Sequence, residues 1–243
     1  MDLKLTVFDI AGTTVYDGDA VHHHLALALA GAGVVAERDE INAVMGIPKP
    51  IAIRTVLERH RPNHRADAHE IDEIHSRFQE TMLIHYRSSS EVRPVAGAVE
   101  TFRELHSHGV KIILDTGFSR PITDAIIERL GWLEDGIIDG SVSSDDVSRG
   151  RPWPDMIYRA MTITGILDPG AVAKIGDTPS DLHEGASAGC RWVIGVTGGS
   201  HSASELSAYP HTHLIYTVAD LPDLFELRRN QSYSMPLAMG ERR

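Results

Sequence analysis

The chain has 243 residues, of which 42 % are hydrophobic, and its 34 acidic and 23 basic side chains give a formal net charge of −11. This composition predicts a soluble globular protein with room for one sizeable core and a smaller module. The sequence holds no apolar run of about 18 residues and opens without the pattern of a secretory signal, so we expect neither a membrane segment nor a leader. Cys190 is the single cysteine, which excludes an internal disulfide and favours a cytoplasmic location. The acidic charge disfavours a nucleic-acid partner.

Short apolar segments followed by turn residues recur along the chain and are typical of buried strands. They are residues 3–10, 110–115, 137–143, 171–176, 191–197 and 214–218. The segments between them carry helical apolar spacing, as at Ile122, Ile126 and Leu130. This alternation predicts an α/β fold, a Rossmann-like parallel sheet with helices on both faces. Ligands of such sheets bind outside the carboxyl ends of the strands.

Residues 16–92 have a different pattern, with helical periodicity and no convincing strand. They end at the polar stretch SSSEVRP, which is typical of a hinge or linker. We therefore expect an all-helical insert, or cap, at residues 16–92, and a core made of residues 1–15 and 93–227. Residues 228–243 have no periodicity, and we expect a loosely ordered tail there.

The first predicted strand delivers a carboxylate to its end. Asp9 closes the apolar run, and Ala11, Gly12 and Thr13 follow in a turn. A carboxylate in this position can attack phosphorus or bind a hard cation. A turn or helix-capping aspartate is an equally common explanation for Asp9 taken alone.

Two further segments carry groups suited to a phosphate. Thr116 and Gly117 follow a predicted strand, where a hydroxyl and free backbone N–H groups make a small anion cradle. The alternative is an ordinary strand-to-helix turn. Arg151 lies on the loop before a predicted helix and supplies a fixed positive charge, although a surface arginine is the commoner case.

A second pair of acids lies in GDTPSD. Asp177 ends a predicted strand, and Asp181 lies four residues further on, close enough for both carboxylates to approach one cation. Thr178 and Asp181 also have the spacing of a capping box. A capping box explains Asp181 and leaves Asp177 unexplained.

These four motifs, in this order and each at the end of a predicted strand, resemble those of the haloacid dehalogenase superfamily, in particular its phosphoryl-transfer branch. The resemblance covers roughly residues 3–200 and implies a Rossmann-like core with an inserted helical cap. It implies that Asp9 is the nucleophile and Arg151 a catalytic cation. It further implies substrate binding by Gly12, Thr13, Thr116, Gly117 and Phe118. Mg2+ would be held by the Asp9 carboxylate, the backbone carbonyl of Ala11 and Asp177, with Asp181 in support.

Ala11 indicates which branch of the superfamily the chain resembles, because phosphatases of this superfamily usually carry an aspartate at this position as general acid. The segment DIAGTT resembles phosphonoacetaldehyde hydrolases (phosphonatases), in which a cap lysine forms a Schiff base with the substrate aldehyde. The imine turns a poor carbanion leaving group into an enamine. Met45-Gly46-x-x-Lys49 resembles the segment that carries this lysine. Lys49 precedes Pro50, so we expect it at a helix N-terminus, where the helix dipole and burial favour the neutral amine.

Lys49 has two alternative roles, an exposed lysine or a phosphate-contacting cation. The chain also departs from the phosphonatases near the proposed imine, with Ala52 in place of histidine, Asp19 in place of cysteine and Phe118 in place of tyrosine. Asp17 or Asp19 is a candidate replacement acid, with turn or cap roles as the alternative.

The expected activity is Mg2+-dependent release of phosphate from a small phosphonate through an aspartyl-phosphate. The alternatives are a phosphomonoester phosphatase, in which Lys49 grips the substrate, and a non-catalytic ligand-binding protein on the same fold. The expected partner is a small phosphorylated or phosphonate metabolite, with no nucleic acid and no membrane. A homodimer is left open.

Overall fold

The computed structural model describes residues 2–63 and 65–227 and centres on a six-stranded parallel sheet in the order β3-β2-β1-β4-β5-β6. The predicted α/β fold is therefore confirmed. The strands are β1 (Leu5–Asp9), β2 (Lys111–Thr116), β3 (Gly140–Ser143), β4 (Val172–Gly176), β5 (Trp192–Val196) and β6 (His213–Ile215).

Two strands, β3 and β6, are three residues shorter at one end than their predicted ranges. Residues 137–139 do not join β3, because the backbone N–H groups of Ile137 and Ile138 both donate to the carbonyl of Trp132 in a turn. At the other edge, β6 ends at Ile215, and the chain enters the 3-10 helix η3 (Val218–Asp220) instead of extending the strand to residue 218.

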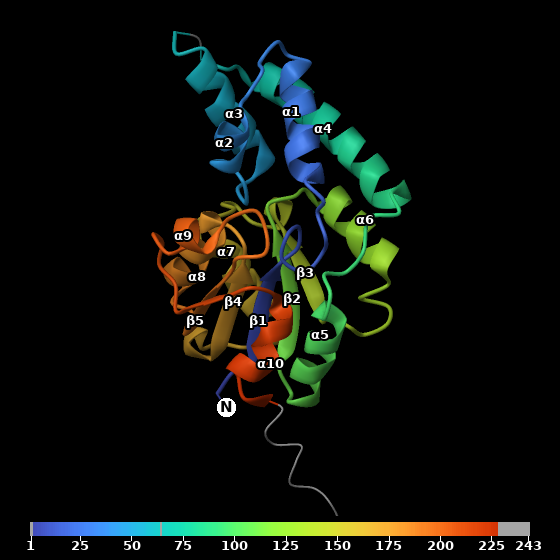
Figure 1. Cartoon of the computed structure of the whole chain (residues 1–243), viewed down its shortest axis with the longest axis vertical. Helices are drawn as coiled ribbons and strands as arrows, with labels where there is room; N and C mark the ends of the chain where they lie inside the picture. Colours follow the sequence, from blue (N-terminus) through green and yellow to red (C-terminus); the bar gives the residue numbers. More distant parts are fainter. Residues whose placement is uncertain (1, 64, 228–243) are drawn as a thin grey trace, which may run out of the picture.

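Four helices lie between β1 and the rest of the sheet in the sequence: α1 (Ala20–Ala30), α2 (Arg38–Asn42), α3 (Lys49–His60) and α4 (Ala68–Ser88). They stand together beyond the carboxyl end of β1 (Figure 1). The remaining helices are α5 (Ala98–Ser107), α6 (Arg120–Leu130), α7 (Asp155–Thr164), α8 (Pro179–Ala188), α9 (Ala203–Leu206) and α10 (Leu221–Leu224), with short 3-10 helices η1 (Ser144–Asp146) and η2 (Pro169–Ala171). The expectation for residues 228–243 lies outside the described residues.

The central strands are apolar on both faces, as a covered parallel sheet requires. Leu5 and Val7 of β1 pack into one cluster with residues of α7 and α8. Phe8 points to the opposite face and packs with Phe102 of α5 at a ring-centroid distance of 5.0 Å. All five residues of β1 are therefore buried between helices on the two faces of the sheet.

The chain order places a crevice at the end of β1. From β1 the chain builds β2 and β3 on one side, then returns to build β4, β5 and β6 on the other. Strands that diverge in this way leave an opening between the loops at their carboxyl ends. Asp9 is the last residue of β1, Thr116 is the last residue of β2, and Asp177 directly follows β4. The fold thus gathers three of the predicted site residues at one edge.

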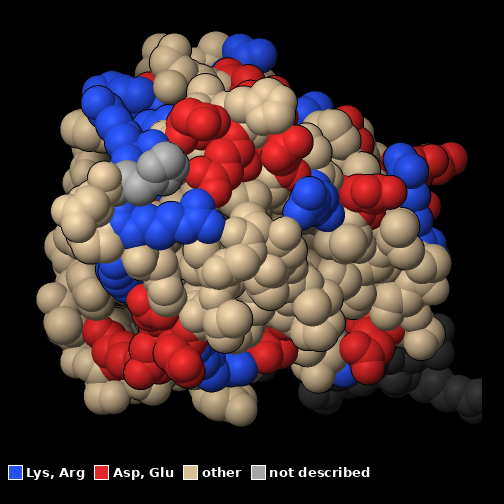
Figure 2. All heavy atoms as spheres, turned by 90° about the horizontal axis from the view of Figure 1, so that it is seen from above, with Lys and Arg blue, Asp and Glu red and all other residues tan. Residues whose placement is uncertain are grey.

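No helix in the described part of the chain is both long enough and apolar enough to span a bilayer. The face seen from above, which carries α1 to α4, mixes acidic and basic side chains (Figure 2).

Candidate active site

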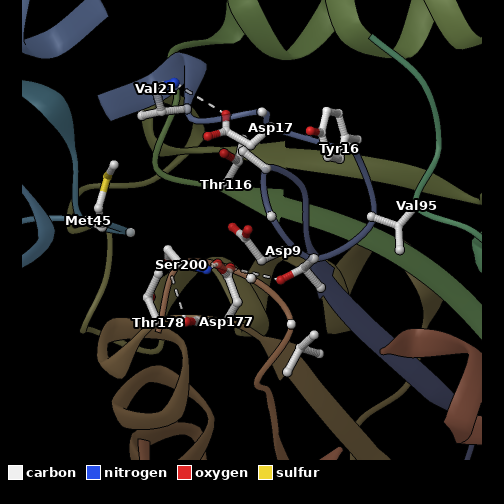
Figure 3. Close-up of a pocket in the computed structure, with 18 of the residues that line it drawn as sticks. Asp9, Tyr16, Asp17, Val21, Met45, Val95, Thr116, Asp177, Thr178 and Ser200 are labelled. Carbon is white, nitrogen blue, oxygen red and sulfur yellow. Dashed lines mark hydrogen bonds between the residues drawn. The ribbon is translucent and has the colours of Figure 1, made fainter. Parts of the chain in front are cut away.

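A pocket of about 1070 Å³ lies between the carboxyl edge of the sheet and the helices α1 to α3. It is lined by nearly all the residues that the sequence singled out, namely Asp9, Ala11, Gly12, Thr13, Lys49, Thr116, Gly117, Phe118, Arg151 and Asp177. Asp181 is fully buried beneath them. In Figure 3, Asp9 projects into the middle of the pocket, with Asp177 and Ser200 on the core side and Asp17 and Val21 on the opposite side.

Asp9 is only 5 % exposed, and its Oδ1 accepts a hydrogen bond from Nη1 of Arg151 at 2.5 Å. Burial raises the pKa of Asp9 to about 8, since the attraction of Arg151 is opposed by the charges of Asp181 and Asp177. A cation bound to the same carboxylate would favour its ionised, nucleophilic form.

Arg151 is not a surface arginine, because it is 1 % exposed and its guanidinium is surrounded by buried carboxylates. Nε donates to Glu184 at 2.9 Å, and Nη2 donates to the backbone carbonyl and side chain of Asp115 at 2.9 and 2.5 Å. Burial works against its charge, but Asp115, Asp181 and Asp9 raise the pKa of Arg151 well above its ordinary value. Arg151 is a fixed cation held against the Asp9 carboxylate.

A second buried cation, Lys174, was missed by the sequence analysis. It lies in the middle of β4, contacts Asp115, and places Nζ 3.0 Å from Asp181 and 3.3 Å from Glu184. Burial, followed by the negative charge of Asp115, raises the pKa of Glu184 well above its ordinary value. The signal was present in the sequence, since a lysine in the apolar run AVAKIG must find a partner when the strand is buried.

Asp177 ties together the loops that follow β1 and β5. Its Oδ1 accepts from the Thr13 hydroxyl at 2.9 Å, and its Oδ2 accepts from the Ser200 N–H and hydroxyl, each at 2.7 Å. Gly12 and Gly199 permit this approach, because a Cβ at either position would collide with the Asp177 carboxylate. Ser200 is a second residue that sequence reasoning missed, because Gly198-Gly199 looks like a plain turn.

Asp181 performs the capping role and also faces the charge cluster. Its Oδ2 accepts from the Thr178 N–H at 3.1 Å, which confirms the predicted capping box at the start of α8. Its Oδ1 lies 3.0 Å from both Arg151 Nη1 and Lys174 Nζ. The capping box thus orients a carboxylate whose second oxygen is left for charge interactions.

The donor set fits a hard divalent cation. Asp9, Asp177 and Asp181 each place a carboxylate oxygen within 4.8 Å of the others, and all three side chains are buried. In the described part of the chain, the buried carboxylates Asp9, Asp115, Asp177, Asp181 and Glu184 outnumber the buried cations Lys49, Arg151 and Lys174. Burial, with the negative charge of Asp181, raises the pKa of Asp177. Carboxylate oxygens with excess negative charge are the ligands that Mg2+ prefers.

Thr116 keeps a proton available for a ligand. Its Oγ1 accepts a hydrogen bond from the Phe118 N–H at 3.2 Å, and the side chain is buried at the pocket wall. The hydroxyl hydrogen can therefore point at a phosphoryl oxygen.

Lys49 is the first residue of α3, as expected, and is 3 % exposed. Its Nζ lies 5.8 and 5.4 Å from the ring centroids of Phe78 and Phe118. Burial lowers the pKa of Lys49 to about 8, although Asp9 and Asp17 pull in the opposite direction. Lys49 is therefore buried, and no ion pair joins it to another residue in the described part of the chain.

The loop before Lys49 is fitted tightly into the core. Gly46 has φ +79°, and a Cβ there would collide with Oγ1 of Thr178. On the core side, a Cβ at Gly117 would lie 2.8 Å from the Gly46 carbonyl oxygen, and one at Gly150 would lie 2.5 Å from Cγ of Pro48. Glycines on both sides of this contact let the loop carry Lys49 into the pocket of Asp9.

Comparison with known proteins assigns the chain to a family. Residues 3–189 match the haloacid dehalogenase-like hydrolases. The chain is 31 % identical over 245 residues to a phosphonoacetaldehyde hydrolase of Bacillus thuringiensis (strain Al Hakam), covering 95 % of this chain and 88 % of the relative. A Bacillus cereus (strain AH187) protein with the same name is 32 % identical over 212 residues, covering 82 % and 78 %.

Solved structures give the same fold. A phosphonoacetaldehyde hydrolase-like protein from Oleispira antarctica superposes with a TM-score of 0.81 at 20 % identity, covering 98 % of this chain and 96 % of the other. A hydrolase from Pseudomonas syringae gives 0.78 at 19 %, covering 92 % and 98 %. The chain is therefore a hydrolase and belongs to the phosphonatase-like branch of the haloacid dehalogenase-like family.

Proposed function

We propose that this hydrolase releases phosphate from a small phosphonate that bears an aldehyde, with Asp9 as nucleophile and Lys49 as the imine-forming amine. The observation that carries the proposal is the placement of Lys49, a buried amine whose pKa is about 8, in the same pocket as Asp9. The names of the curated relatives point to the same substrate class.

Lys49 would act first, because a carbon–phosphorus bond needs an electron sink before it breaks. Nζ attacks the aldehyde carbon, and loss of water gives an imine. Asp9 then attacks phosphorus, and the electron pair of the carbon–phosphorus bond moves toward the imine nitrogen to give an enamine. Water hydrolyses the resulting aspartyl-phosphate and returns Asp9 as a carboxylate. Protonation of the enamine carbon and hydrolysis of the resulting imine release the aldehyde product and return the Lys49 amine.

Arg151 and Thr116 would manage the phosphoryl group. Arg151 lies against Asp9 and reduces the repulsion between its carboxylate and the phosphoryl oxygens. The Thr116 hydroxyl donates to one of those oxygens, and the N–H group of Gly117 adds a second donor to the cradle. Gly12 and Thr13 line the same pocket and would contact the substrate there.

Asp9, Asp177 and the backbone carbonyl of Ala11 would hold Mg2+, with Asp181 in support. When bound, the metal supplies charge neutralisation at the phosphoryl oxygens. The hydrogen bonds of Thr13 and Ser200 to Asp177 hold that carboxylate in position for the role.

A phosphomonoester phosphatase is the second candidate, favoured by the side chains beside Lys49. Ala52 is fully buried without a polar group, and Phe118 places a plain ring there. Neither side chain can move a proton for an imine. In this case Lys49 would grip the ester as a cation.

The proposal also includes the division of the chain into a core and a cap. Residues 16–92 would act as a cap that closes over the pocket and excludes water from the aspartyl-phosphate. A cytoplasmic location and a small phosphorylated or phosphonate metabolite as partner complete it.

The test is phosphate release from phosphonoacetaldehyde and from a panel of phosphate monoesters, with Mg2+ present. We expect turnover that Asp9→Asn abolishes, and borohydride added with phosphonoacetaldehyde is expected to inactivate the enzyme by modifying Lys49. Ester turnover without a Lys49 adduct selects the second candidate. Turnover retained by Asp9→Asn excludes both.

A further inference from the structure

Asp17 is a pocket-lining carboxylate with no role in the reaction described above. The alanine at position 11 leaves the site without the acid that other phosphatases of the superfamily place there. We propose that Asp17 supplies this missing acid and gives the proton to the atom that leaves phosphorus. The inference rests on the proposed function, since it assigns the leaving-group proton of that reaction.

The loop between β1 and α1 holds Asp17 at the pocket. Oδ1 accepts a hydrogen bond from the Val21 N–H at 3.3 Å, and the Asp17 backbone carbonyl accepts from the Ala20 N–H at 2.9 Å. Figure 3 shows the carboxylate turned into the pocket, toward Val21. In the described part of the chain no hydrogen bond engages Oδ2, so this oxygen is available to a substrate.

The surroundings of Asp17 suit proton transfer at moderate pH. The charged and titratable groups that face it are Lys49, Asp19, Asp177 and Tyr86. Burial raises the pKa of Asp17 to about 6, opposed by the Val21 N–H and Lys49. A carboxyl group with a pKa in this range can both give and take a proton near neutrality.

The neighbouring Asp19 is excluded as the acid by its own contacts. Its two oxygens accept from Nη1 and Nη2 of Arg38 at 2.8 and 2.7 Å on the exposed side of the loop. This hydrogen bond lowers the pKa of Asp19, so the group stays ionised. Asp19 therefore provides a matched control two residues away.

The proton balance closes over one turnover. When Asp9 takes the phosphoryl group from an ester, the electron pair of the broken bond stays on the departing oxygen, and Asp17 protonates that oxygen. With a phosphonate the pair passes into the enamine, and Asp17 protonates the enamine carbon. Water then attacks the aspartyl-phosphate, and the Asp17 carboxylate takes the proton that the water loses. The reaction consumes one water and returns Asp17 to its acid form.

The experiment compares the wild-type chain with Asp17→Asn and Asp19→Asn in the presence of Mg2+. The probes are phosphonoacetaldehyde, glycolaldehyde phosphate and para-nitrophenyl phosphate, whose leaving group needs no proton. Asparagine keeps an oxygen for the Val21 N–H, so the start of α1 is preserved. Melting temperatures check the fold, and Asp17→Glu, which keeps an ionisable acid, is the second variant.

We expect Asp17→Asn to lower kcat by about 100-fold or more for the first two probes and by no more than about 5-fold for the nitrophenyl ester. The wild-type rate with glycolaldehyde phosphate is expected to fall as the pH rises above about 6, the pKa of Asp17. Asp17→Asn loses this fall, Asp17→Glu keeps it, and Asp19→Asn matches the wild type.

The inference is overturned if Asp17→Asn slows all three probes by the same factor or leaves every rate and pH profile unchanged. An Asp17→Glu variant without the fall in rate contradicts it as well. These results leave the proposed function standing, provided that Asp9→Asn is inactive. A wild-type chain that releases phosphate from no probe overturns both.

Discussion

At the scale of single residues, Lys174 shows how the buried carboxylates below the pocket depend on a neighbouring positive charge. It is buried in β4 and faces Asp115, Asp181 and Glu184. Arg151 is the other positive charge that contacts these three carboxylates. Removing one partner of a buried ion pair leaves an uncompensated charge, which costs more free energy than the pair contributes. Lys174 is therefore a structural support for the buried charge cluster.

We expect Lys174→Met to lower the free energy of unfolding by about 3–5 kcal/mol. Lys111→Met is the matched control, because the Lys111 ammonium is half-exposed where it bonds Asp139, and about 0.5 kcal/mol or less is expected there. Urea unfolding curves for both variants measure the difference. Equal losses in the two variants would contradict the account of the cluster.

Lys49 gives a pH prediction at the same scale. Only the neutral amine attacks an aldehyde, and the neutral fraction rises as the pH passes upward through the pKa, which burial lowers to about 8. Inactivation by borohydride with phosphonoacetaldehyde should therefore rise with pH and level off above about 8. Lys49→Arg should resist inactivation throughout. A rate still climbing steeply at pH 10 would mean that Lys49 behaves as an ordinary lysine.

At the scale of elements, a close contact between the core and the loop before α3 determines where Lys49 lies. Gly46, Gly117 and Gly150 make the contact between this loop and the core close enough to carry Lys49 into the pocket. The sequence pattern Met45-Gly46-x-x-Lys49 indicated which lysine matters. It did not reveal that the glycine faces Thr178 of the core, because that contact depends on tertiary packing.

Gly46→Ala should disrupt this contact and lower kcat/KM by about 10-fold or more, since small displacements of a reacting group are costly. Gly33→Ala is the matched control. Gly33 also has a positive φ, +77°, but a Cβ there meets no atom within 4 Å. The control should carry only backbone strain, about 1 kcal/mol of stability, and keep its activity. Equal activity in the two variants would show that the loop contact does not position Lys49.

At the scale of the whole molecule, the sequence predicted the sheet and the location of the site, but not every residue that holds the site together. Apolar strands ending at Asp9 and Asp177 indicated the sheet and the edge at which the site forms, because the carboxyl ends of parallel strands meet there. The roles of Ser200 and Glu184 could not be predicted. Ser200 reaches Asp177 from the loop after β5, a strand that is neighbour to β4 only in the folded sheet, and Glu184 pairs with Arg151 across 33 residues of sequence.

The central claim for the whole molecule is that Asp9 bonds directly to phosphorus. The most direct measurement is a crystal structure of the chain with Mg2+ and beryllium fluoride, which mimics a phosphoryl group on a carboxylate. The account predicts the beryllium on an oxygen of Asp9, with its fluorides facing Thr116 and Arg151. Beryllium fluoride attached to another side chain, or bound away from Asp9, would contradict it.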